Sequence, residues 1–173
     1  IWQAGMSGVL CVAAAGNDGR DADSFPIYPA AFGDPSILSV AALDANDALA
    51  TFSNYGPTST DLGAPGVGIL SCLPNGAYGL MSGTSMATPH VAGAAALVLA
   101  QSPVIPVSGL KSLLLANVTP IGSWSTRVAS GGRLNVFNAA NAIAANAPPT
   151  VTITNPSPGA TFVAPATVTL VAN

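Results

Sequence analysis

Charged residues are scarce in this chain of 173 residues. They make up 6% of the sequence, and all the acids are aspartate, whereas an average soluble domain has about 25% charged residues. Four basic residues are too few to neutralise a nucleic-acid backbone, so we expect no nucleic acid among the partners. The low charge also argues against a disordered chain and against a coiled coil, which needs charged flanking positions.

Cysteines and long apolar runs are scarce as well. Cys11 and Cys72 are too few for a disulfide scaffold. Both fall in apolar segments, which favours buried free thiols, although a disulfide between them or with a cysteine outside this sequence stays open. Neither has a second Cys or a His nearby, so we expect no metal site there. The longest mostly apolar run, Val91–Ala100, has ten residues, whereas a membrane-spanning helix needs about 20, so we expect no membrane span.

The few charges are unevenly placed along the chain. All seven aspartates lie at or before Asp61, so residues 1–61 carry a net charge of −6 (seven Asp and one Arg), and the remaining residues carry +3. A solvated acidic loop is the main interpretation of the segment Asp18–Asp23, and a cation site there is the weaker alternative.

Apolar runs closed by turns predict strands that alternate with helices. The run 8–15 ends in Gly16-Asn17-Asp18-Gly19, which is typical of a strand buried on both faces of a parallel sheet. We expect helix 85–101 to be buried on all sides and Ser108 to cap the next helix. The expected strands are 8–15, 36–42, 49–52 and 68–72, and the expected helices are 2–7, 85–101, 108–115 and 136–145. The alternation predicts an α/β domain.

The composition changes after residue 145. The segment 146–149, Asn-Ala-Pro-Pro, is typical of a stiff linker. Residues 150–154 and 166–171 then alternate Thr with Val, Ile or Leu, which predicts two β-strands. Because two strands alone are marginally stable in water, we expect the all-β module to continue beyond Asn173.

The segment Gly83–Gly93, with the sequence GTSMATPHVAG, carries the strongest chemical signal. Ser85 is expected in the first turn of a helix, where free backbone N–H groups and the positive helix end stabilise a neighbouring oxyanion. The small residues around Gly83 let a substrate approach the backbone. On this pattern alone, a helix-capping serine without a catalytic role is the simpler interpretation.

The same segment resembles the nucleophile motif of the subtilisin-like serine proteases. Four further segments resemble parts of that family in the same order and at similar spacing: 13–19, 50–57, 61–67 and 132–136. The resemblance covers about residues 1–145 and implies a three-layer α/β fold with a mainly parallel sheet, which we expect to be incomplete at its N-terminus.

The resemblance also predicts the domain organisation. Residues 1–145 are expected to form the C-terminal part of a subtilisin-like peptidase domain, and 146–149 a linker. Residues 150–173 resemble the first strands of a bacterial immunoglobulin-like β-sandwich module.

The resemblance implies a role for individual residues. Ser85 is the expected nucleophile that attacks the scissile carbonyl. Asn17 is expected to donate its side-chain amide to the oxyanion, with the backbone N–H of Ser85 as the second donor, although Asn17 in Gly-Asn-Asp-Gly by itself indicates a turn. Substrate-binding roles are expected for Ala14, Ala15, Gly16, Gly83 and Thr84. Tyr28-Pro29 resembles a Tyr-Pro pair at which the family has a cis proline.

His90, the only histidine, does not fit the role of the catalytic base. Five residues after Ser85 on one helix, it lies about 140° round the axis and about 7.5 Å along it. The family's order is Asp, His, Ser, so we expect the catalytic His and Asp upstream of Ile1. We therefore expect residues 1–173 alone to be inactive and poorly soluble.

The resulting hypothesis is a secreted, monomeric serine endopeptidase that acts on proteins or peptides through an acyl-enzyme. Catalysis of this kind needs no cofactor. Structural calcium fits the family, but the sequence locates no site for it. Two alternatives stay open: a non-catalytic pseudoenzyme, and a surface-binding or adhesion protein on the same scaffold.

Overall fold

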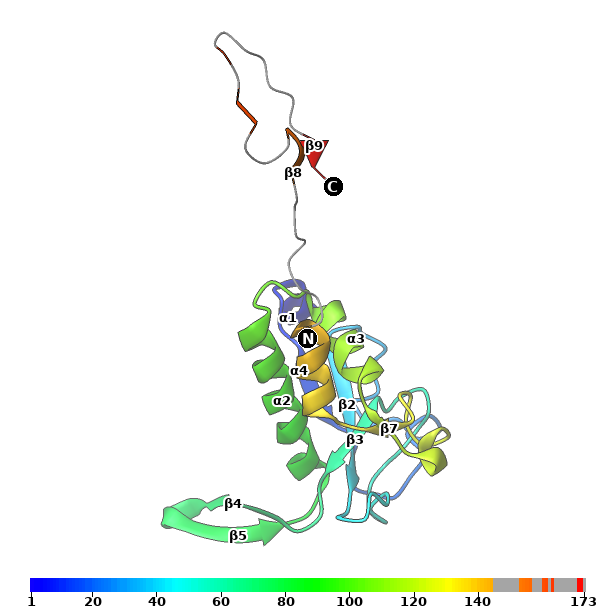
Figure 1. The fold of residues 1–173 in the computed structure, drawn as a ribbon. Coiled ribbons are helices and arrows are strands. Elements are labelled where there is room, and N and C mark those ends of the chain that lie inside the picture. Colours follow the sequence, from blue (N-terminus) through cyan, green and yellow to red (C-terminus); the bar gives the residue numbers. More distant parts are fainter. Residues whose placement is uncertain (145–152, 157–159, 162, 164–170, 173) are drawn as a thin grey trace.

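A five-stranded, mainly parallel sheet organises the chain (Figure 1). The computed structural model describes residues 1–144, 153–156, 160–161, 163 and 171–172. The strands of this sheet are β1 (Cys11–Ala14), β2 (Ile37–Leu43), β3 (Leu62–Pro65), β6 (Thr119–Pro120) and β7 (Gly132–Arg133). Their order is β1-β2-β3-β7-β6, and only β6 runs antiparallel to its neighbour. The predicted α/β class with a mainly parallel sheet is confirmed.

The central strand β2 is buried along its whole length. Val40 and Ala42 join the core on the helical side of the sheet, whereas Ala41 and Leu43 join the core on the other side. Successive side chains of a strand point to opposite faces, so a strand that is covered on both sides is apolar at nearly every position.

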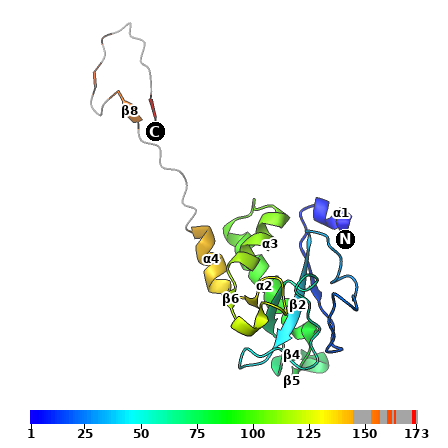
Figure 2. The same cartoon turned by 90° about the vertical axis from the view of Figure 1, so that its right-hand side faces the viewer.

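Three helices cover one face of the sheet: α2 (Thr84–Gln101), α3 (Val107–Ala116) and α4 (Val136–Ala144). They contact one another, and α2 also contacts the first three strands of the sheet (Figure 2). The short helix α1 (Trp2–Met6) precedes β1. The other face carries the segment 121–128, which contains the 3-10 helix η2 (Gly122–Trp124).

Trp124 closes the core on that second face. It is 2% exposed. A Cβ atom added at Gly63 on β3 would collide with its ring. A glycine at position 63 therefore lets the indole pack closely against the sheet.

A two-stranded antiparallel ribbon leaves the sheet after β3. It consists of β4 (Ile69–Leu73) and β5 (Ala77–Met81), joined by the 3-10 turn η1 (Pro74–Gly76). Figure 1 shows the ribbon extending from the body of the domain. Leu70, Tyr78 and Leu80 on it are between 65% and 71% exposed.

One expectation for a strand is wrong, and another is confirmed only in part. Residues 49–52 form no strand: Leu49 makes a single bridge to Leu43, and Thr51 and Phe52 lie in a turn. The segment 68–72 does form a strand, but it belongs to the exposed ribbon and not to the buried sheet. An apolar run marks a strand without showing which sheet it joins.

The expectation of complete burial fails for two other elements. Helix α2 buries one stripe that includes Val91 and Val98, while Leu97 and Leu99 on its far side are exposed. The strand expected over 8–15 forms as β1, but it lies at the edge of the described sheet and is half-buried.

Smaller corrections concern a cap and a cysteine. Helix α3 begins at Val107 with Pro106 at its N-cap position, so Ser108 is inside the first turn and caps nothing. Cys11 and Cys72 are both free; Cys11 is half-buried, but Cys72 is exposed, so the prediction of a buried thiol is wrong for it.

The tail contains a short antiparallel pair, β8 (Ile153–Asn155) with β9 (Val171–Ala172). The linker 146–149 and most of 150–173 lie outside the described residues. An immunoglobulin-like module therefore stays a prediction.

The acidic segment 18–23 uses one of its carboxylates to hydrogen-bond the loop around Thr58 and Ser59. The Asp23 carboxylate accepts the backbone N–H groups of Ser59 at 2.7 Å and Thr58 at 3.1 Å. Burial works to raise the pKa of Asp23, but these hydrogen bonds outweigh it, and the pKa lies below its ordinary value. Among the described residues, no three His, Cys, Asp or Glu side chains gather as metal ligands, and no helix is long and apolar enough to cross a membrane.

One partly buried ion pair ties α3 to the sheet. The Lys111 ammonium lies 2.9 Å from Oδ1 of Asp61 and donates to the carbonyl oxygen of Ile37. The second carboxylate oxygen of Asp61 accepts the backbone N–H of Ser39 at 2.7 Å. Both charged side chains are at most 20% exposed, so losing one would leave the other poorly solvated.

We therefore expect Lys111→Met to lower the free energy of unfolding by about 2 kcal/mol, because Asp61 loses its partner in a poorly solvated position. Urea unfolding of the full-length gene product measures the change. Arg133→Met is the matched control, since the Arg133–Asp47 pair at 2.8 Å is about twice as exposed and lacks hydrogen-bond alignment. The control should cost less than about 1 kcal/mol, and equal losses in the two variants would contradict this account.

Candidate active site

The start of α2 lies at the carboxyl ends of the parallel strands. Gly66, just after β3, donates its N–H to the carbonyl of Leu43 at 2.9 Å and accepts the N–H of Gly83 at 2.8 Å. These bonds join the end of β2 to the first residue of the nucleophile motif. Ligands of open α/β sheets bind at this edge, so the structure places the motif where a site is expected.

Thr84 orients the side chain of Asn17. The backbone N–H and the hydroxyl of Thr84 both donate to Oδ1 of Asn17, at 2.9 Å and 3.0 Å. With Oδ1 occupied twice, the Nδ2 amine is the group that Asn17 has available for a ligand. Asn17 is exposed, and a Cβ atom at Gly83 would lie 3.6 Å from this Nδ2 atom.

Ser85 is the second residue of α2 and is exposed. Its backbone N–H lies in the first turn, where N–H groups have no carbonyl partner within the helix. The Ser85 hydroxyl, the Ser85 backbone N–H and the Asn17 amide thus belong to one part of the protein surface, where Thr84 connects the helix to Asn17. Such a surface can hold an oxygen that gains negative charge, because each donor is fixed before the charge develops.

Asn54 holds the loop that carries Asn17. Its buried amide donates to the carbonyl of Ala15 at 3.0 Å and accepts the N–H groups of Asp18 and Arg20 at 3.0 and 3.1 Å. Gly16 has a φ of +107°, and a Cβ atom there would collide with the Asn54 amide. The sequence placed Asn54 within a family-like segment but gave it no role, because its partners are more than 30 residues away in the chain.

The residues expected to bind substrate occupy different environments. Ala14 and Gly16 are half-buried at the end of β1. Ala15 is 1% exposed, and its N–H donates to the carbonyl of Val40 at 3.0 Å, so its side chain belongs to the core. Gly83 and Thr84 lie beside Asn17, and Thr84 has the positioning contact described above. Their contacts with a substrate stay predictions.

The resemblance also placed a cis proline after the loop, and the bond between Tyr28 and Pro29 is cis.

A cavity of about 310 Å³ lies beside Ser85. It is bounded by Ile69, Leu70 and Ser71 of the ribbon and by Ser85, Met86, Pro89 and His90 of α2. His90 shares the cavity with Ser85, but its Nδ1 atom lies 2.9 Å from the carbonyl oxygen of Met86 and is engaged by the helix backbone. The cavity contains no carboxylate that could orient a histidine base.

Comparison with known families decides the classification. Residues 1–137 match the Subtilase family. The chain belongs to the subtilase family. Among curated relatives, this subtilase chain is 44% identical over 118 residues to subtilisin amylosacchariticus from Bacillus subtilis subsp. amylosacchariticus, which covers 68% of the chain and 30% of that protein. It is also 44% identical over 118 residues to a subtilisin from Bacillus pumilus, covering 42% of that protein.

A relative from an organism outside the genus Bacillus is similar as well. Subtilisin-like protease 2 of Plasmodium falciparum is 47% identical over 91 residues, which is 53% of the subtilase chain and 7% of the relative. The chain thus spans between 7% and 42% of the length of these three relatives.

We expect Thr84→Val to lower kcat of the full-length gene product about tenfold with KM nearly unchanged, because the Asn17 amide loses one of the two bonds that aim it. Removing the Asn17 donor itself should cost more, about 10²–10³-fold in turnover, a magnitude known from subtilisin itself. Steady-state hydrolysis of a chromogenic peptide measures both.

Thr88→Val is the matched control. The Thr88 hydroxyl donates to the carbonyl of Thr84 at 2.8 Å, within the same helix, and does not touch Asn17. If this control lowered kcat as much as Thr84→Val, the loss would come from the helix and not from the aim of Asn17.

Proposed function

We propose that this chain carries the nucleophile and the oxyanion donors of a serine endopeptidase. The observation that supports the proposal best is the fixed Asn17 amide, held by Thr84 beside the start of the helix that presents Ser85. Family membership supports the same class of reaction.

In the proposed reaction, Ser85 Oγ attacks the carbonyl carbon of the scissile peptide bond. The carbonyl oxygen becomes an oxyanion that accepts hydrogen bonds from Nδ2 of Asn17 and from the backbone N–H of Ser85. A base takes the Ser85 proton and returns it to the leaving amine, and water then releases the acyl group from Ser85.

The base and the carboxylate that orients it are proposed to come from sequence outside residues 1–173. The only histidine in the chain is His90, whose Nδ1 atom is bonded to the helix backbone. Residues 1–173 by themselves should therefore be inactive, because Ser85 has no group that removes its proton.

The remaining features of the proposal follow from the same family. The substrates are proteins or peptides, bound along Ala14–Gly16 and beside Gly83 and Thr84. The protein is secreted and monomeric, and its chemistry uses protein groups without a cofactor. Structural calcium has no assigned site. Residues 150–173 are proposed as the first strands of an immunoglobulin-like module after a linker at 146–149.

The alternative is a non-catalytic protein for binding or adhesion on the same scaffold. The sequence upstream of Ile1 discriminates between the two. Motifs such as Asp-Thr-Gly and His-Gly-Thr there support the protease, whereas substitutions at both the aspartate and the histidine would favour the alternative.

A fluorophosphonate probe tests the proposal directly. We expect stoichiometric labelling of the full-length gene product and no labelling of the Ser85→Ala variant, because only an activated serine reacts with the probe. Ser71→Ala is the matched control, since Ser71 lines the same cavity without lying at the helix start. Mass spectrometry of the labelled peptides identifies the modified serine.

The same probe tests the missing base. Residues 1–173 alone should remain unlabelled over the time in which the full-length protein reacts completely. Stoichiometric labelling of Ser85 in residues 1–173 would show that this segment activates its own nucleophile. Failure of the full-length protein to react would instead favour the non-catalytic alternative.

A further inference from the structure

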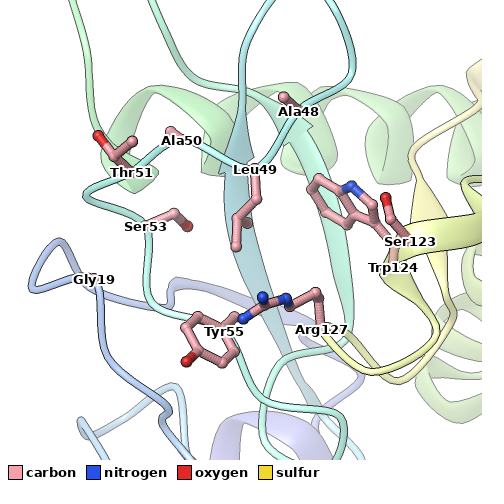
Figure 3. Close-up of a pocket in the computed structure, with 10 residues that line it drawn as sticks. All are labelled: Gly19, Ala48, Leu49, Ala50, Thr51, Ser53, Tyr55, Ser123, Trp124 and Arg127. Carbon is pink, nitrogen blue, oxygen red and sulfur yellow. The ribbon is translucent and has the colours of Figure 1, made fainter.

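A second cavity lies apart from the Ser85 site, on the face of the sheet that carries Trp124 (Figure 3). Its volume is about 390 Å³, within the range of small-ligand sites. Its walls come from the loop 48–55 between β2 and β3, from Gly19, and from residues 123–127. It shares no residue with the cavity beside Ser85. We call it the Arg127 pocket.

Backbone hydrogen bonds hold the three walls of the Arg127 pocket together. The N–H of Gly19 donates to the carbonyl of Phe52, and the N–H of Gly56 donates to the carbonyl of Arg127, both at 2.7 Å. Trp124 forms a rigid wall, since it is almost completely buried against the sheet. The pocket is therefore formed before any ligand arrives, which lowers the cost of binding.

Arg127 brings a positive charge to this pocket. Its guanidinium carbon lies 4.5 Å from the centre of the Tyr55 ring, and Figure 3 shows the two side chains stacked at one end of the cavity. Within the described part of the chain, no carboxylate lies within 4.0 Å of the Arg127 side chain. Stacking fixes the plane of the guanidinium and leaves its edge free to donate two parallel hydrogen bonds to a carboxylate.

The nearest acidic segment does not neutralise Arg127. Asp21 forms a bridge with Tyr55, but its carboxylate accepts the N–H of Asp23 at 2.9 Å and the Ser24 hydroxyl at 3.3 Å. These bonds commit the Asp21 carboxylate to its own turn. The guanidinium is thus available to a carboxylate from outside the chain.

The other residues that line the Arg127 pocket indicate which kind of molecule would carry that carboxylate. Leu49, which is half-buried, gives the pocket its apolar side, and Trp124, which is 2% exposed, lies behind it as part of the core (Figure 3). The hydroxyls of Thr51 and Ser123 add hydrogen-bonding groups near the rim, where both residues are exposed. A ligand that matches these walls has an apolar body and one carboxylate.

We propose that the Arg127 pocket binds the carboxylate of an apolar C-terminal amino-acid residue. Its stacked guanidinium holds the carboxylate, and the apolar side at Leu49 receives the side chain. Hydrolysis of a peptide bond creates a new C-terminal carboxylate, so a product of the reaction proposed above has this chemistry; that connection rests on the proposed function, whereas the binding does not.

Calorimetry with two small probes tests the pocket in the full-length gene product. N-acetylphenylalanine carries the carboxylate, and N-acetylphenylalaninamide differs from it only at that group. We expect the acid to bind at least about tenfold more tightly than the amide, because a charged, two-point hydrogen bond is lost in the amide. Arg127→Gln should weaken binding of the acid by about the same factor and remove the difference between the probes.

Two further variants separate the pocket from general effects. Arg20→Gln is the matched control, because Arg20 also stacks on an aromatic ring, that of Phe25, but does not line the pocket. It should leave both affinities unchanged. Ser123→Trp should block both probes by filling the pocket, since Ser123 is exposed at its wall.

Calorimetry on protein that is already labelled at Ser85 by the fluorophosphonate tests whether the two cavities are independent. It should bind the acid as tightly as the unlabelled protein, and Arg127→Gln should still be labelled at the normal rate. Equal affinity for acid and amide, no binding of the acid, or loss of binding after labelling of Ser85 would each overturn the proposal. None of these results would bear on whether Ser85 is the nucleophile.

Discussion

The pair of hydrogen bonds from Thr84 to Asn17 is the contact on which the candidate site depends. It joins the loop after β1 to the start of α2, two segments that are 67 residues apart in the sequence. Because both bonds end on Oδ1, they decide which end of the Asn17 amide faces a ligand. Asn54 supports the loop from beneath, and Gly66 fixes the helix start from the other side.

This arrangement explains how the loop and the helix of the candidate site are held together in a chain with so few charged residues. Loop and helix are joined through backbone groups and the neutral side chains of Thr84, Asn17 and Asn54. Neutral dipoles of this kind can be buried near the core at a much lower desolvation cost than ions. The less exposed of the two ion pairs among the described residues, between Lys111 and Asp61, lies elsewhere and fastens α3 to the sheet.

The two cavities differ in the chemistry that they offer. The cavity beside Ser85 is bounded by the ribbon and α2 and presents the candidate nucleophile Ser85. The Arg127 pocket presents a fixed cation without a nucleophile. Gly19 lies in the wall of the Arg127 pocket and is only two residues beyond Asn17. The same loop therefore contributes to both sites, although the two cavities share no lining residue.

The sequence was a good guide to elements that are long or strongly patterned. The apolar run around Val40, the helix after Gly83 and the Ala-rich helix after Asn135 all form close to where the sequence places them. It failed at Leu49, which makes a single bridge and no strand, and at Leu70, where an apolar strand is exposed. Propensity describes the local backbone, whereas sheet membership and burial depend on distant partners.

By itself, the sequence determined the α/β class, the family resemblance and the identity of Ser85 and Asn17 as candidates, because these are encoded in apolar periodicity and in contiguous motifs. Only the tertiary structure decided that Thr84 aims Asn17, that Asn54 supports the loop, and that Arg127 stacks on Tyr55 over a pocket. The physical reason is sequence separation. Each of these contacts joins residues between 34 and 72 positions apart, and no short-range pattern fixes a contact of that kind.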